Sequence, residues 1–196
     1  MPSSQSAQFR ILTVCTGNIC RSPAADLLLA ADLADDPRFA VSSAGTHAMA
    51  GWPISSPMDE LLADRGIDSS AFVARQATRD IIAASDLILT ATREHREWVT
   101  AHDPRALRRA FTLTEFTDAV RAHPNPSDVS ATELVAWATA NRPSALVTSR
   151  GSSTRRGYAE GDILDPYGRG EAAYIASLAQ IEPLTAEIAR VLSATS

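Results

Sequence analysis

The sequence contains no lysine, and all 18 of its basic residues are arginine. This absence excludes enzymes that form a Schiff base on a lysine side chain. Cysteine is scarce as well: Cys15 and Cys20 are the only two, and they lie too close together to form the disulfide framework of a secreted protein. No cysteine or histidine pair has the spacing of a zinc site. We therefore expect no metal and no cofactor.

Long apolar runs and a strong net charge are also missing. The run from Ile11 to Val14 is too short for a signal-peptide core or a membrane span. The 196 residues carry 23 acidic and 18 basic side chains, a net charge of -5, which argues against a broad nucleic-acid or membrane footprint. We expect one cytoplasmic domain over residues 1–196, a monomer with no nucleic-acid or membrane partner. If the protein binds an anion, a local group of side chains and backbone amides must hold it.

The hydrophobic pattern alternates between strands and helices. Residues 9–14 mix β-branched and apolar side chains and end at a Thr-Gly-Asn turn, which predicts a buried strand. Ser22 is the expected N-cap of the next helix, and Pro23 its first helical residue. Further strands are expected at 39–43, 86–90 and 111–113. Further helices are expected at 56–66, 93–102 and 170–192. A short helix is expected to end at residue 84, and another to begin at a capping box formed by Ser130 and Glu133.

Strands that alternate with helices at this spacing form a parallel sheet with helices on both faces. The predicted fold class is therefore α/β with three layers, and its ligands bind at the carboxyl ends of the strands. Cys15 follows the first strand, at that edge. Residues 124–161 have a different composition, rich in proline, serine, threonine and glycine, and we expect an inserted, partly mobile segment there.

The stretch from Cys15 to Ser22 lies between a predicted strand and a predicted helix. A glycine-containing loop at a helix N-terminus points several backbone N–H groups into one concavity, where the helix dipole adds partial positive charge. The planar guanidinium of Arg21 can meet two phosphate oxygens at once. Thiolate is the nucleophilic form of cysteine, and both the helix end and the arginine favour it. The stretch thus predicts a phosphate-binding loop with a nucleophile at its floor.

A proton donor for a departing oxygen is available far downstream, in Asp165-Pro166-Tyr167. Proline fixes the backbone after Asp165, which helps to aim the carboxyl group from a loop. The side chain of Tyr167 can flank an aromatic substrate ring. Cleavage of an aryl phosphate needs such an acid, so Asp165 joins Cys15 and Arg21 as a candidate catalytic residue.

Cys-x-Gly-Asn-x-Cys-Arg-Ser-Pro at residues 15–23, with Asp-Pro-Tyr at 165–167, resembles the low-molecular-weight protein tyrosine phosphatase family, in its bacterial branch. The segments at 43–46, 74–76 and 86–88 are also similar to that family. The resemblance implies a four-stranded parallel sheet and a phosphotyrosine-containing protein substrate, for which bacterial tyrosine kinases of polysaccharide export are candidates. It also implies a phosphocysteine intermediate on Cys15, with Asp165 acting first as acid and then as base.

The same resemblance implies roles for the neighbouring residues. Asn18 would brace a strained loop backbone, Ser22 would stabilise the thiolate, and Cys20 could form a reversible, protective disulfide with Cys15. Ile19 is apolar as in the phosphotyrosine branch, whereas the phosphoarginine branch commonly carries threonine. Met49 stands roughly where the family often has an aromatic residue. The predicted substrate-binding residues are Thr16, Gly17, Asn18, Ile19, Cys20, Ser22, Met49 and Tyr167.

Two other functions compete with a tyrosine phosphatase. An arsenate reductase of the same fold begins with the same attack on an oxyanion; no cysteine follows Cys20, so it would need an external thiol for recycling. A phosphate-dependent binding module with little turnover is the third possibility, and the presence of Cys15, Arg21 and Asp165 together argues against it. The four histidines are scattered along the sequence, and we assign them no chemistry.

Overall fold

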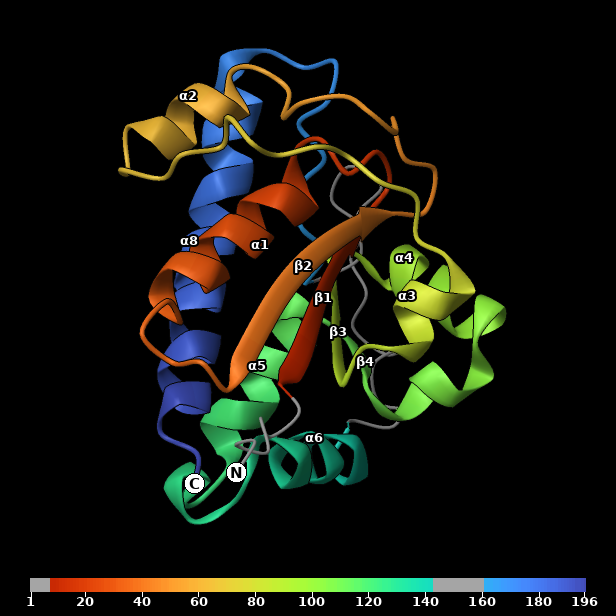
Figure 1. Ribbon diagram of the computed structural model, residues 1–196, viewed down its shortest axis with the longest axis vertical. Helices are drawn as coiled ribbons and strands as arrows, with labels where there is room; N and C mark the ends of the chain where they lie inside the picture. The colour runs from red at the N-terminus through yellow and green to blue at the C-terminus, as the bar shows by residue number, and fades with distance from the viewer. Residues whose placement is uncertain (1–7, 143–160) are drawn as a thin grey trace, which may run out of the picture.

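A computed structural model describes residues 8–142 and 161–196 of the chain. Its centre is a four-stranded sheet in the order β2-β1-β3-β4, in which every neighbouring pair is parallel. Figure 1 shows helices on both sides of this sheet, as predicted for a three-layer α/β fold. The strands are β1 (Phe9–Cys15), β2 (Phe39–Gly45), β3 (Leu87–Thr90) and β4 (Ala110–Thr112).

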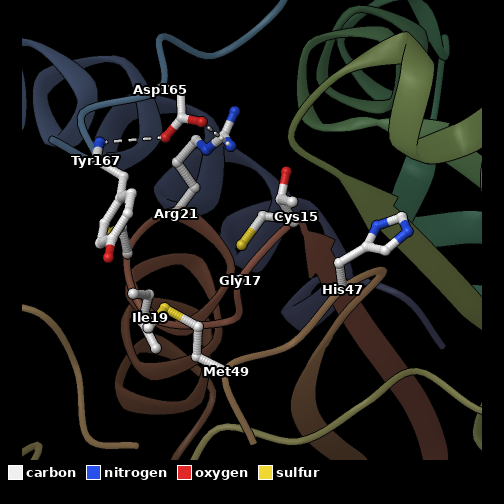
Figure 2. A pocket seen from close by; sticks show the side chains of 10 residues that line it. Cys15, Gly17, Ile19, Arg21, His47, Met49, Asp165 and Tyr167 are labelled. Atoms are coloured by element: carbon white, nitrogen blue, oxygen red, sulfur yellow. Dashed lines mark hydrogen bonds and ion pairs between the residues drawn. The ribbon is translucent and has the colours of Figure 1, made fainter.

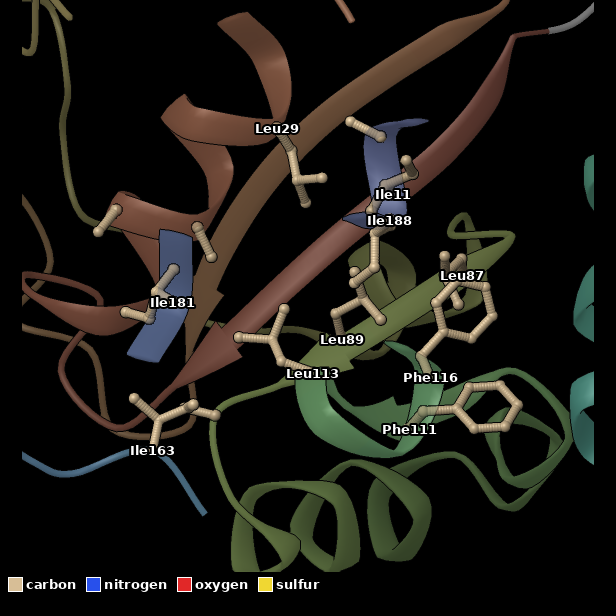
Figure 3. Close-up of a cluster of buried hydrophobic side chains, with 14 of the residues drawn as sticks. Ile11, Leu29, Leu87, Leu89, Phe111, Leu113, Phe116, Ile163, Ile181 and Ile188 are labelled. Carbon is tan, nitrogen blue, oxygen red and sulfur yellow. The ribbon is translucent and has the colours of Figure 1, made fainter. Parts of the chain in front are cut away.

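Side chains that alternate along β1 reach two separate hydrophobic clusters. Ile11 packs in the larger cluster and Leu12 in the smaller one, because successive side chains of a strand point to opposite faces. Figure 3 shows the larger cluster, to which Leu29 and Phe116 belong together with Ile11. Burying each such side chain contributes roughly 1.5–3 kcal/mol to folding. The strands are therefore fixed from both faces.

The helices divide between these two faces. The larger cluster is covered by α1 (Arg21–Asp32), α5 (Leu113–Ala122) and α8 (Glu171–Ser193), and α8 packs against both α1 and α5. The smaller cluster is covered by α3 (Arg79–Ala83), α4 (Arg93–His102) and the 3₁₀ helix η1 (Pro104–Arg108). The short helix α2 (Met58–Ala63) contacts α8. Within the described ranges, no helix combines the length and apolar composition that crossing a membrane requires.

The first helix begins earlier than predicted. α1 starts at Arg21 after Cys20, so the prediction that Ser22 caps it and Pro23 opens it was wrong. The Ser22 hydroxyl is engaged with Cys15 and Asn18 instead, which prevents it from capping. Proline is tolerated at the third helical position because the first four amides of a helix have no intrahelical partner. Arg21 consequently lies inside the first helical turn.

Among the α-helices of the described residues, α5 was not predicted. β4 ends at Thr112, and the fourth strand was expected to continue to Leu113, which is instead the first residue of α5. Thr112 accepts a hydrogen bond from the Glu115 amide, and the Glu115 carboxylate accepts one from the Thr112 amide. This capping box turns the chain from strand to helix without any intervening loop.

Part of the segment expected to be an insertion is helical. A 3₁₀ helix η2 (Pro126–Asp128) precedes α6 (Ala131–Ala140), which starts at the predicted capping box of Ser130 and Glu133. α6 packs on α5 and lies at the opposite end of the sheet from the carboxyl ends of the strands (Figure 1). Residues 143–160 of the segment lie outside the described residues.

Candidate active site

A pocket of about 170 Å³ opens at the carboxyl end of β1. It lies over the loop that joins β1 to α1, as expected for a parallel sheet. Figure 2 shows the side chains that converge on it from the two predicted motifs. The lining residues are Cys15, Thr16, Gly17, Ile19, Cys20, Arg21, His47, Met49, Asp165 and Tyr167. Of the predicted site residues, Asn18 and Ser22 are buried and do not line the pocket.

Backbone hydrogen bonds hold the loop from its outer side. The carbonyls of Cys15, Thr16, Gly17 and Ile19 accept from the amides of Thr46, His47, Met49 and Ser55 respectively, at 2.8–3.0 Å. With the carbonyls turned outward, the loop amides are left for the pocket. Among the hydrogen bonds of the described residues, no amide from residues 16–20 is a donor. Such a cluster of free N–H groups at a helix N-terminus suits an oxyanion.

The close approach of the loop to β2 depends on a glycine. A Cβ atom built on Gly45 would lie 2.4 Å from the carbonyl oxygen of Thr16. That distance is shorter than any real contact of a Cβ atom, so a side chain at this position would push the loop away. Gly45 therefore lets the end of β2 act as a support for the loop.

Asn18 gives the loop its turn. Its φ angle is 55°, in the left-handed region that asparagine tolerates better than most residues. The buried side chain donates to the Ser22 hydroxyl at 2.9 Å and accepts from the Arg75 amide at 2.9 Å. These two bonds compensate for the unfavourable backbone conformation.

The sulfur of Cys15 lies at the floor of the pocket, and the residue is only 2% exposed. Its Sγ is 3.0 Å from the Ser22 hydroxyl. Because that hydroxyl accepts from Asn18, its own hydrogen is available to the sulfur. The carbonyl of Ala44 is a more distant alternative acceptor, at 3.4 Å. A hydrogen bond to sulfur stabilises the thiolate.

Arg21 and Asp165, which are 144 positions apart, form an ion pair at the pocket (Figure 2). Arg21 Nη2 is 2.8 Å from Asp165 Oδ2; the guanidinium side chain is 4% exposed and the carboxylate 35%. The Tyr167 amide donates to the other carboxylate oxygen at 3.2 Å, which holds the group in place. Arg21 Nε is buried and has no hydrogen-bond partner among the described residues. The two motifs therefore meet at one charged centre.

Cys20 differs from Cys15 in its surroundings. Burial, and then the neighbouring Cys15, raise the pKa of the Cys20 thiol to about 12. Its Sγ is 4.0 Å from the Tyr174 hydroxyl. Cys20 is thus held as a neutral thiol near the pocket. Both cysteines are free, and their disulfide stays a prediction.

An apolar wall closes one side of the pocket. Figure 2 shows Ile19 and Met49 next to each other, with the Tyr167 ring beside Ile19 on the same side of the pocket. Tyr167 is 54% exposed and so lies at the rim. Trp52, the aromatic residue nearest to Met49 in the sequence, is exposed and does not line the pocket. A thioether and an aliphatic chain therefore form the wall that would face a substrate ring.

Two histidines to which the sequence analysis assigned no chemistry belong to the site. His47 lines the pocket, and the buried His95 forms a hydrogen bond with Thr16 of the loop at 2.8 Å. The one local signal for His95 is its position three residues after Thr92, which caps α4 directly after β3. That spacing identifies a helix start at the carboxyl edge of the sheet but does not show which way the ring points.

Comparisons with known proteins agree with this geometry. Residues 10–137 match the family model described as "Low molecular weight phosphotyrosine protein phosphatase". A probable low molecular weight protein-tyrosine-phosphatase, EpsP of Ralstonia nicotianae, is 36% identical over 123 residues, which cover 63% of this chain and 83% of that protein.

Solved structures share the fold. The YwlE arginine phosphatase from Geobacillus stearothermophilus has a TM-score of 0.68 at 28% identity, covering 94% of this chain and 93% of that one. The tyrosine phosphatase amsI of Erwinia amylovora also has a TM-score of 0.68, at 24% identity and 97% coverage of both chains. The family match spans more than half of the sequence, and the α/β sheet is the same. This chain is therefore a phosphatase and belongs to the low molecular weight phosphotyrosine protein phosphatase family.

Proposed function

We propose that the protein hydrolyses phosphotyrosine and related aryl phosphate monoesters through a cysteinyl-phosphate intermediate on Cys15. The observation that carries this proposal is the meeting of three groups in one pocket: the Cys15 sulfur, the Arg21 guanidinium and the Asp165 carboxyl. A nucleophile, a cation and a proton donor are what the cleavage of a phosphate ester requires.

In the first step the phosphate lies over Cys15, with its oxygens among the loop amides and the Arg21 guanidinium. The unpartnered Nε of Arg21 supports this role, because an oxyanion would give it an acceptor. The Cys15 thiolate attacks phosphorus, so that a P–S bond forms while the P–O bond to the leaving group breaks. Asp165, in its acid form, gives its proton to the departing oxygen.

In the second step a water molecule attacks the phosphorus of the cysteinyl phosphate. The Asp165 carboxylate, now a base, accepts a proton from that water, and the P–S bond breaks to release inorganic phosphate and the thiolate. The Ser22 hydroxyl, 3.0 Å from the sulfur, stabilises the thiolate both before attack and after release. One carboxyl group therefore serves in both halves of the reaction.

The apolar wall supports an aromatic substrate. Hydrophobic surface for a flat ring is offered by Ile19, Met49 and Tyr167. Because the Cys15 sulfur lies at the floor of the pocket, a long phosphorylated side chain reaches it best. We therefore propose a phosphotyrosine-containing protein as substrate, with a bacterial tyrosine kinase as a candidate partner. A relative of similar fold is an arginine phosphatase, so a phosphoarginine peptide is the necessary comparison substrate.

The decisive experiment measures hydrolysis of para-nitrophenyl phosphate and of a phosphotyrosine peptide in the presence of a metal chelator. We expect turnover by the wild type and a loss of roughly 10⁴-fold or more in Cys15→Ser, because the nucleophile is removed. Normal turnover by Cys15→Ser would disprove the mechanism. Preference for the phosphoarginine peptide would disprove the substrate, and arsenate-dependent consumption of a small thiol faster than ester hydrolysis would favour the reductase alternative.

A further inference from the structure

We infer that His95 is a positioning residue for the phosphate-binding loop, because its imidazole ties Thr16, the residue after the nucleophile, to the N-terminus of α4. This inference rests on the proposed function, since it concerns how the loop presents its amides to a phosphoryl group. It deepens that function by adding to the site a side chain that belongs to neither motif.

His95 reaches the loop because β1 and β3 are neighbours in the sheet. Val14 pairs with Thr90 at the ends of these strands, and the Ala91 amide donates to the Val14 carbonyl at 2.9 Å. The chain then turns into α4, with Thr92 as N-cap and His95 in the first turn. The start of α4 is thereby placed beside the start of the phosphate-binding loop.

Both nitrogens of the ring are engaged. Nδ1 lies 2.8 Å from the Thr92 hydroxyl, and Nε2 lies 2.8 Å from the Thr16 hydroxyl. The residue is 5% exposed, so its two ring nitrogens are shielded from bulk water. A ring bonded at opposite edges cannot rotate without losing a partner, and a buried polar group without a partner is costly. The position of Thr16 is therefore linked to that of the α4 N-terminus.

The imidazole works as a neutral group. Burial, followed by the charge of Arg21 and the proximity of His47, lowers the pKa of His95 to about 3. A neutral imidazole has one donor and one acceptor, which matches a bridge between two hydroxyl groups. Because the ring carries no charge at the pH of most enzyme reactions, it can hold the loop without competing with Arg21 for the anion.

Thr16 is held from two sides. Its carbonyl accepts from the His47 amide and lies against Gly45 at the end of β2, whereas its hydroxyl bonds to His95 next to β3. If the His95 bond is lost, Thr16 can move away from β3, and the loop amides that follow it lose their common direction. Misaligned donors weaken binding of the phosphoryl group in both ground state and transition state.

Two substitutions of similar polarity separate this role from a general packing role. The terminal amide of glutamine can reach the place of Nε2 and so keep the bond to Thr16, whereas the amide of asparagine reaches only the place of Nδ1. We expect His95→Asn to lose roughly tenfold in kcat/KM for para-nitrophenyl phosphate, the equivalent of one hydrogen bond, and His95→Gln to lose less than about threefold. Thr16→Val should resemble His95→Asn, and the double variant should be no worse than either.

A binding measurement keeps this test independent of turnover. Inorganic phosphate should protect Cys15 from alkylation by iodoacetate, and mass spectrometry measures the alkylated fraction. The phosphate concentration that gives half-maximal protection should be roughly tenfold higher in His95→Asn than in the wild type. If the wild type hydrolyses no aryl phosphate, the proposed function fails, while this difference still tests His95. Should His95→Asn fail to fold, Thr16→Val at the exposed end of the bridge carries the test. Equal protection in wild type and Thr16→Val, or equal losses in His95→Asn and His95→Gln, would overturn the inference.

Discussion

The phosphate-binding loop and the segment that carries Asp165 line one pocket but are held in different ways. The loop is buried except at Thr16 and Gly17, and it is braced by backbone bonds to residues 46–55, by Asn18 and by Ser22. The Asp165 carboxylate is 35% exposed, and it is held by the ion pair with Arg21 and by the Tyr167 amide. The nucleophile and the anion site are therefore mostly buried, whereas the proton donor lies at the edge of the pocket, within reach of water. That division suits a reaction in which one carboxyl group first gives and then takes a proton.

The ion pair is the point at which the two regions meet, and Arg21→Lys should produce the largest effect after Cys15→Ser. Lysine keeps the charge but loses the planar pair of donors that can bind a phosphate and a carboxylate together. We expect kcat/KM for para-nitrophenyl phosphate to fall by roughly 10³-fold, with weaker inhibition by inorganic phosphate. Steady-state kinetics measure both. If Arg21→Lys keeps kcat/KM within tenfold, the guanidinium geometry is not required.

Asp165→Asn separates the proton donor from the anion site. We expect kcat for a phosphotyrosine peptide to fall by roughly 10²-fold, because no acid protonates the departing oxygen. The fall should be smaller for para-nitrophenyl phosphate, whose leaving group is the weaker base. Phosphate inhibition should persist or strengthen, since Arg21 is freed from its carboxylate partner. Weaker inhibition in this variant would show that the two regions do not act separately.

The same division explains what could be predicted from the sequence. Cys15 to Ser22 form one contiguous stretch between a strand end and a helix start, so its chemistry could be inferred from the sequence. Even there the helix start was misplaced, because Ser22 bonds to the sulfur rather than capping. Asp165 was proposed from the need for a proton donor and from the Asp-Pro-Tyr motif, but its ion pair with Arg21 is visible only in the fold.

His95 and α5 show why the remainder was missed. The hydrogen bond from His95 to Thr16 joins residues 79 positions apart, so only the packing of α4 against the sheet reveals it. The Thr112/Glu115 capping box is visible in the sequence, but it overlaps the end of a three-residue strand, and the apolar residues there fit either element.

Gly45→Ala would test whether the loop depends on its support by β2. The added methyl group would meet the Thr16 carbonyl, so either β2 or the loop must shift. We expect a loss of about 2 kcal/mol in the free energy of unfolding and about tenfold weaker phosphate inhibition. Urea unfolding and inhibition kinetics measure the two effects. Gly170→Ala is the control, because no atom lies near its added Cβ. If phosphate affinity is unchanged in Gly45→Ala, the loop does not need this contact.

The smallest effect is expected at the pocket wall. Met49→Phe replaces a flexible thioether with a ring that can stack on an aromatic substrate beside Ile19. We expect KM for a phosphotyrosine peptide to fall by about threefold, with kcat nearly unchanged, because the wall contacts the ring in ground state and transition state alike. Phosphate inhibition should not change, since Met49 contributes its side chain to the wall and not to the anion site. A change in phosphate inhibition as large as that in KM would mean that the pocket wall also affects anion binding by the loop.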